Sequence, residues 1–107
     1  MNKKVLEVVS MDIAQEMSRY ADALLRTKDS RYLRLVGELN AAYNHCVASI
    51  AGDGDIYCLL KHLATAIVLA GEVDGDATAI YQMVATITND KIQPCVACHQ
   101  EEEKEDK

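Results

Sequence analysis

Apolar residues recur along most of the chain at steps of three and four positions, the spacing of one face of an α-helix. Four segments show this pattern: 4 to 27, 30 to 51, 55 to 70, and 76 to the cysteine pair near the C-terminus. No window shows the alternation of a β-strand. The residues expected to face inward are Leu6, Val9, Ile13, Met17, Tyr20 and Leu24; Tyr32, Val36, Leu39, Tyr43, Cys46 and Ile50; Ile56, Leu59, Leu60, Leu63, Ile67 and Ala70; and Ile80, Met83, Val84, Ile87 and Ile92.

Glycine and aspartate mark the breaks between these segments, at 52 to 55 and 71 to 76. Glycine ends helices by adopting the left-handed conformation, and aspartate begins them by capping free N–H groups. Asp29 or Ser30 is the expected cap of the second segment. Four amphipathic helices with short connections predict an all-α fold, an antiparallel four-helix bundle, with residues 1 to 107 forming a single domain.

Pro94 is the only proline, and it lies immediately before the cysteine pair. Inside a helix, proline removes a hydrogen bond and favours a kink, whereas the first position of a helix tolerates it. The pair therefore lies either after a kink in the fourth helix or on a short final helix that begins near Pro94.

The net charge of −6 excludes a nucleic-acid binder, which needs a basic surface. No segment approaches the roughly 18 apolar residues that predict a membrane span. The acidic end, 101 to 107, predicts a solvated, fraying tail that could also attract a basic redox partner. We find no catalytic triad, phosphate-binding loop or paired carboxylates in an apolar setting, and we therefore expect no enzyme.

The most specific feature is Cys95-Val96-Ala97-Cys98-His99. The Cys-x-x-Cys-His spacing is the signature of covalent haem attachment. On a helix, Cys95 and Cys98 share a face, and His99 follows one turn after Cys95. Two thiols can then bond the haem vinyl groups while the imidazole binds iron, which makes His99 the expected proximal ligand.

A zinc site is the alternative interpretation of these cysteines. Cys58 and His62 are spaced for one face of the third helix, and with Cys95 and Cys98 they would complete a Cys₃His tetrahedron. The chain would then be a zinc-stabilised helical interaction module in the cytoplasm. A thioredoxin-like redox pair is disfavoured because the chain lacks a βαβ pattern.

The remaining candidates are weaker. Cys46 and Cys58 are expected in the core, although a disulfide between them is open if the protein is exported. His45 and His62 are expected to be surface or half-buried side chains rather than ligands.

With these helices and this motif, the chain resembles the cytochrome c-prime family, including its low-spin, methionine-ligated relatives. Those proteins are four-helix bundles with one haem attached near the C-terminal end of the last helix, where Cys95 to Gln100 lies here. The segments 11 to 17, 23 to 25 and 64 to 81 are similar in style to theirs. Where the family has an aromatic residue and an arginine after the haem histidine, this chain has Glu101, Glu102 and Glu103.

The resemblance implies a periplasmic haem protein that transfers electrons to a redox partner or binds a small gas such as NO or CO, and it allows a homodimer through the first two helices. It also implies that a residue of the first helix faces the distal side of the haem. Met17, on the apolar stripe, is the favoured candidate for ligation or packing there, and Met11 is the alternative. Residues 1 to 10 begin basic but place Glu7 in their apolar part, so they do not predict a signal peptide.

Overall fold

The fold was examined in a computed structural model, which describes the backbone of residues 2–52 and 55–103 and the side chains of 2–52 and 55–90. All regular structure in these ranges is helical. The helices are α1 (Lys3–Thr27), α2 (Arg31–Ile50), α3 (Ile56–Val73) and α4 (Thr78–Glu103). The predicted all-α class is confirmed, and the predicted helix starts are correct to within two residues.

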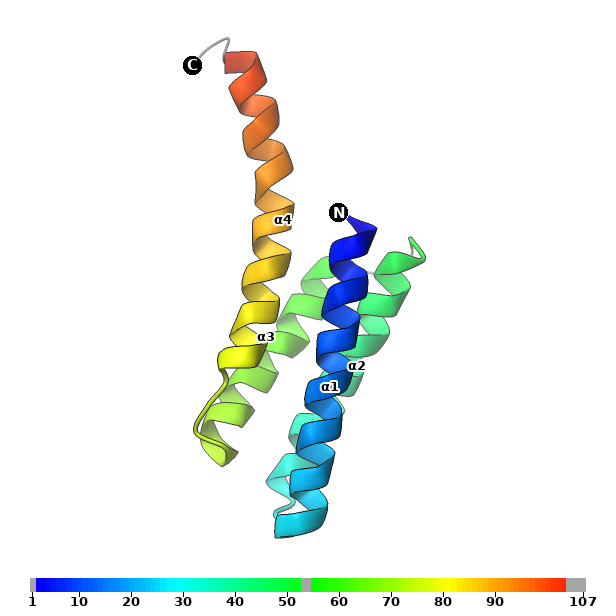
Figure 1. The fold of residues 1–107 in the computed structure, drawn as a ribbon, viewed down its shortest axis with the longest axis vertical. Coiled ribbons are helices and arrows are strands. Elements are labelled where there is room, and N and C mark those ends of the chain that lie inside the picture. The colour runs from blue at the N-terminus through cyan, green and yellow to red at the C-terminus, as the bar shows by residue number, and fades with distance from the viewer. Residues whose placement is uncertain (1, 53–54, 104–107) are drawn as a thin grey trace.

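The four helices pack together, and the chain reverses at each of the three connections (Figure 1). α1 contacts α2 and α4, and α3 contacts the same two helices. Contacts between distant residues fix how α1 and α2 lie together. The buried Cys46 Sγ lies 3.1 Å from the Leu6 carbonyl oxygen near the start of α1. At the other end of α1, the Tyr20 ring stacks on Tyr32 at a centroid distance of 6.0 Å.

A continuous apolar core fills the space between the helices. Its residues are Leu6, Val9, Ile13, Tyr20, Ala23, Tyr32, Leu35, Leu39, Ala42, Cys46, Leu59, Leu63, Ala66, Leu69, Ala70, Ile80, Met83 and Ile87. Most were expected from the sequence, but Ala23, Leu35, Ala42, Ala66 and Leu69 were not. Several expected core residues are instead half-buried around it: Met17, Leu24, Val36, Tyr43, Ile50, Ile56, Leu60, Ile67 and Val84.

The breaks between helices use the expected chemistry with one difference. Asp55 caps α3 by accepting a hydrogen bond from the Tyr57 N–H at 2.9 Å, and Gly52 and Gly75 take positive φ angles of 95° and 73°. At the start of α2, of the two expected caps it is the Asp29 side chain that accepts, its Oδ1 receiving the Arg31 N–H at 3.0 Å. The difference is that α3 continues beyond its expected end near residue 70 to Val73.

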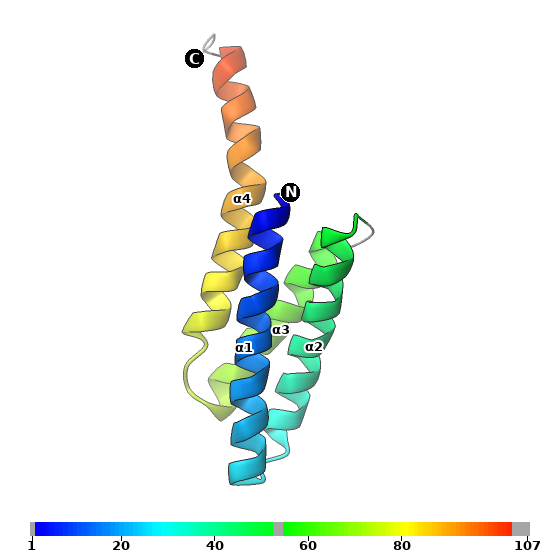
Figure 2. The same cartoon turned by 45° about the vertical axis from the view of Figure 1, so that its right-hand side comes forward.

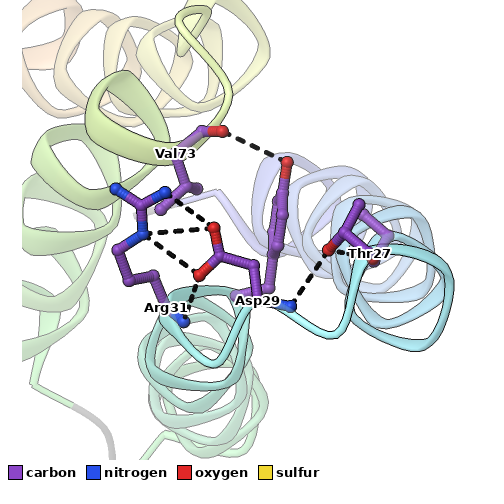
Figure 3. A network of polar contacts seen from close by, with 6 residues as sticks. Thr27, Asp29, Arg31 and Val73 are labelled. Atoms are coloured by element: carbon purple, nitrogen blue, oxygen red, sulfur yellow. Dashed lines mark hydrogen bonds and ion pairs between the residues drawn. The ribbon is translucent and has the colours of Figure 1, made fainter.

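The end of the molecule at the α1–α2 turn is tied together by polar contacts (Figure 3). Arg31 binds the carboxylate of Asp29 with an Nη2–Oδ2 distance of 2.7 Å. The Tyr32 hydroxyl donates to the Val73 carbonyl oxygen at 3.2 Å, which joins the start of α2 to the end of α3. Because these contacts link three helices, we call this end of the molecule the closed end.

At the opposite end, α4 extends past the other helices, and both views show its last turns standing clear of them (Figures 1 and 2). The Asn2 N–H donates to the Asp90 Oδ2 at 3.0 Å, so α1 begins at the level of Asp90. We call the part of α4 after this contact, residues 91–103, the α4 extension. At about 1.5 Å per residue it measures about 20 Å, which is consistent with a longest dimension of 58 Å for the whole molecule.

By length and composition alone, α3 is apolar enough to cross a membrane; it is the single such helix among the described residues. The core helix of a soluble bundle meets the same criterion. α3 contacts α2 and α4, its Leu59, Leu63 and Ala66 lie in the core, and its His62 binds Glu38 of α2. One face of α3 therefore belongs to the core, and 28% of its apolar stretch is buried.

Candidate haem-attachment site

The first half of α4 is anchored in the core, and this anchor sets the direction of the extension. Thr78 begins the helix, and its N–H donates to the Asp76 Oδ1 at 2.9 Å. Ile80, Met83 and Ile87 then bury their side chains among the other helices. The helix axis is fixed by these contacts before the chain reaches the motif.

The motif lies on the α4 extension, in continuous helix. α4 runs through Pro94 to Glu103, so the alternative of a separate final helix beginning near Pro94 is wrong. Cys95, Cys98 and His99 occupy helical positions i, i+3 and i+4, which share one side of one turn. Their side chains, like all those after Asp90, lie outside the part of the structure that is described.

Pro94 removes one hydrogen bond from α4. It has no N–H, so the carbonyl of Asp90 lacks its usual helical donor. Asp90 is also the residue whose carboxylate receives the Asn2 N–H. The Asn2–Asp90 contact therefore coincides with a missing helical hydrogen bond in α4.

The two candidate distal methionines lie on α1, away from the level of the motif. Met17 is half-buried beside the core, and Met11 is 64% exposed. From the Asn2–Asp90 contact, Met17 lies about 22 Å along α1 in one direction, and His99 lies about 13 Å along α4 in the other. The structure therefore does not bring either methionine beside His99.

The alternative zinc set is also spread along the helices. Cys58 and His62 lie one turn apart in the first half of α3, whereas Cys95 and Cys98 lie on the α4 extension, whose backbone stands clear of the other helices (Figures 1 and 2). Two cysteine sulfurs on one zinc ion are only about 4 Å apart. The structure therefore does not bring Cys58 and Cys95 together.

Cys46 and Cys58 are both free thiols, so the disulfide that the sequence left open is not formed. Cys46 points toward α1 and donates to the Leu6 carbonyl, and burial raises the pKa of its thiol to about 11. Cys58 donates to the Asp55 carboxylate at 3.4 Å, and this hydrogen bond raises the pKa of the thiol. Among the described residues, neither cysteine is poised as a thiolate.

Sequence reasoning missed one polar cluster, on the faces of α2 and α3 that meet. The rings of His45 and His62 stack at a centroid distance of 5.2 Å, and the His62 Nδ1 lies 2.8 Å from the Glu38 Oε1. Glu38 and His45 are two helical turns apart on α2, and this spacing was the signal available in the sequence. His45 and His62 are both half-buried, which agrees with the expectation of surface or half-buried side chains.

The side chains that the structure describes include no group of three or more His, Cys, Asp or Glu residues placed to hold a metal ion. No family model, curated protein or solved structure matches this chain. The functional argument therefore depends on the chemistry of the motif and on its position in the fold.

Proposed function

We propose that this protein is a monohaem c-type cytochrome with the architecture of an antiparallel four-helix bundle. Cys95 and Cys98 would hold the haem through thioether bonds, and His99 would be the proximal iron ligand. The observation that carries the proposal is the unbroken course of α4 through the motif. In a helix, residues 95, 98 and 99 occupy positions i, i+3 and i+4, and this spacing supports attachment to neighbouring pyrrole rings and to iron.

The donor set fits this group and the position makes it accessible. A bound haem would supply a one-electron iron centre. Cys95 and Cys98 would fix its orientation relative to the helix, and His99 would set the electronic character of its proximal side. Because the backbone of the extension stands clear of α1, α2 and α3 (Figure 1), the attachment machinery could approach this segment in the folded protein.

Electron transfer is the better supported of the two activities expected for this fold. Gas binding needs a distal pocket, whose polarity and access govern the ligand. The described parts of α1 to α3 supply no side chain at the level of the motif, because α1 begins level with Asp90. An exposed haem edge and the acidic residues 101–103 would instead suit contact with a basic redox partner.

The direct test is maturation of the protein in a periplasm that contains the haem-attachment machinery. We expect the mass of the product to rise by one haem and a c-type absorption spectrum to appear. Cys95→Ser and Cys98→Ser should each remove one thioether bond, and the double variant should retain no covalent haem. Cys58→Ser is the matched control and should keep full loading. An unloaded wild-type chain under these conditions would end the proposal.

The same sample decides the distal ligand. Met17→Leu and Met11→Leu are expected to leave the spectrum of the loaded protein unchanged, because both residues lie far along α1 from His99. If Met17→Leu instead converted a six-coordinate spectrum to a five-coordinate one, the end of α4 would have to lie back along α1 in the loaded protein. That result would favour the methionine-ligated relatives that the sequence resembles.

The zinc module built from Cys58, His62, Cys95 and Cys98 has less support, because its two halves are separated along the bundle and His62 already binds Glu38. It predicts that a chelator unfolds the protein and that Cys58→Ser is as damaging as Cys95→Ser. The haem proposal predicts neither effect.

A further inference from the structure

In the part of the chain that the structure describes, one side of α3 has no helix against it. α3 contacts α2 and α4, and its Leu59, Leu63 and Ala66 lie in the core. Tyr57 and Val68, on the opposite side, are 68% and 59% exposed. A contiguous apolar surface on a soluble protein is typical of an interaction site. We call the exposed residues of this side the α3 outer face: Tyr57, Lys61, Ala64, Val68, Gly71 and Glu72.

The shape of the α3 outer face suits a second helix. Its first five positions follow one another at steps of four and three, so they form one row along α3. The half-buried Leu60 and Ile67 border this row. At Gly71 nothing lies within 4 Å of the point that a Cβ atom would occupy, and Ala64 is the other small residue of the row. A partner helix can therefore approach closely on either side of Val68.

Two residues of opposite charge lie on this face. Lys61 and Glu72 are the charged residues of α3, and they are about three helical turns, or about 16 Å, apart on the same side of the helix. Among the described residues, neither takes part in an ion pair. Arg31 of α2 interacts electrostatically with Glu72, but its guanidinium is bound by Asp29 at 2.7 Å. Both charges are therefore available to a partner.

We propose that the α3 outer face binds the same face of a second copy of this chain, with the two α3 helices antiparallel. Such a contact has a two-fold axis, and this symmetry requires a face that is complementary to itself. With the axis level with the midpoint of residues 66 and 67, Lys61 and Glu72 are each about 8 Å from it along the helix. Because the axis keeps the same flank of the two helices together, Lys61 of each copy lies beside Glu72 of the other. Val68, about 2 Å from the axis, meets its counterpart at the centre.

Charge complementarity selects this occupant over others. In a parallel pair, each Lys61 would face the other Lys61 and each Glu72 the other Glu72, and like charges repel. An anionic membrane surface would attract Lys61 and repel Glu72. A homodimer through the first two helices, which the family resemblance allows, would leave the α3 outer face uncovered. The antiparallel pair of α3 helices satisfies both charges and covers the apolar row between them.

The first test is the mass of the full chain in solution, measured by sedimentation equilibrium over a range of concentrations. One chain is 11.8 kDa, and we expect a reversible dimer of twice that mass, with and without haem. Val68→Asp should weaken dimerisation by about tenfold or more, because it buries a charge at the centre of the contact. Met11→Asp is the matched control. Met11 is also exposed, at 64%, but it lies on α1, which does not contact α3, so this variant should dimerise as the wild type does.

The second test exchanges the charges. Lys61→Glu and Glu72→Lys should each weaken the dimer by about tenfold, because like charges then lie beside each other. The double variant re-forms both ion pairs with their signs reversed and should dimerise nearly as the wild type does. Arg26→Glu, the same change of charge at an exposed position of α1, should have little effect. Circular dichroism of each variant checks that the helices remain, so that a loss of the dimer is not a loss of the fold.

The third test needs no substitution. A carbodiimide joins an amine to a carboxylate that lies in contact with it, and Lys61 and Glu72 of one chain are about 16 Å apart, too far for this reaction. In a mixture of chains with light and heavy nitrogen isotopes, mass spectrometry should find the Lys61–Glu72 link between a light and a heavy peptide.

Three results would overturn the proposal. The first is a chain that stays monomeric at all concentrations, including one that instead binds phosphatidylcholine vesicles through Val68. The second is a dimer that Met11→Asp breaks and Val68→Asp does not, which would place the contact on α1. The third is a charge exchange that fails to restore the dimer, or a dimer without the Lys61–Glu72 link, because the antiparallel register requires both.

Discussion

The two ends of this molecule differ in how many helices hold them in place. At the α1–α2 turn, Tyr20 and Tyr32 stack, and Tyr32 also bonds the end of α3. At the other end, the α4 extension continues alone after the Asn2–Asp90 contact. The Cys-x-x-Cys-His motif, the most specific feature of the sequence, therefore lies at the end of the molecule where α4 continues without neighbouring helices.

This difference indicates that the stability of the fold and the proposed haem attachment depend on separate residues. Among the side chains that the structure describes, the last one of α4 that belongs to the core is Ile87. The extension must keep its helical form largely through its own hydrogen bonds, which isolated helices of this length do only marginally. A covalently attached haem would then be held by a segment that the other helices support at one end but do not surround.

The largest expected effect comes from the core near the closed end. Leu35 is fully buried, and Leu35→Ala should lower the free energy of unfolding by about 3 kcal/mol through lost burial and the cavity that remains. Denaturant unfolding followed by circular dichroism measures this. The matched variant Cys98→Ala, in protein without haem, should change stability by less than about 0.5 kcal/mol. Equal losses would show that the extension packs on the bundle.

A smaller effect is expected from the hydrogen bond that joins α2 to α3. Tyr32→Phe keeps the stacked ring and removes the donor to the Val73 carbonyl oxygen, which should cost about 1 kcal/mol. Thermal unfolding provides the measurement. Tyr81→Phe is the control, because that residue is 62% exposed and its change should have little effect.

Pro94→Ala tests the independence of the extension itself. Alanine restores the missing donor to the Asp90 carbonyl and favours helix, so amides after position 94 should become better protected from hydrogen exchange. The global unfolding free energy should change by less than about 0.5 kcal/mol, because the bundle core is untouched. A large global stabilisation would argue that the extension and the bundle unfold as one unit.

The smallest effect is the pH dependence of the closed end. Hydrogen bonds from Arg31 lower the pKa of Asp29 from 3.8 to about 2 in the folded protein. A lowered folded-state pKa means that the contribution is complete above about pH 4 and is lost as the pH falls toward 2. Asp29→Asn should therefore lower the melting temperature slightly at pH 6, and most of this difference should be lost by pH 2, where about half of the folded-state carboxyl is protonated. A difference that persisted unchanged at pH 2 would remove the ionised carboxylate as its cause.

Local sequence patterns predicted the positions of the helices, but they did not predict every residue that the helices bury. Leu6, Val9, Ile13 and Tyr20 were expected inside and are buried, since each lies in the middle of a clear apolar stripe. Leu35 and Leu69 were missed because a helix between two neighbours buries a wider arc than one stripe predicts. Val36 and Tyr43 lie at the edge of that arc and are half-buried.

The site could be predicted only in part, for a related reason. The motif is local in sequence, and α4 confirms its helical spacing, whereas its haem chemistry stays a prediction. The level of α4 relative to α1 depends on how Ile80, Met83 and Ile87 fit the core, which no local pattern encodes. The distal position of Met17 therefore could not be judged from the sequence. The His45–His62 stack was missed because it requires the register of α2 against α3.

The burial of Cys46 has a consequence for the chemistry of its thiol. Its pKa of about 11 leaves almost no thiolate near neutral pH, and its sulfur faces the Leu6 carbonyl inside the bundle. Alkylating reagents and oxidised glutathione should therefore modify it only when the bundle opens. The rate of Cys46 labelling would therefore report directly on opening of the packed helices.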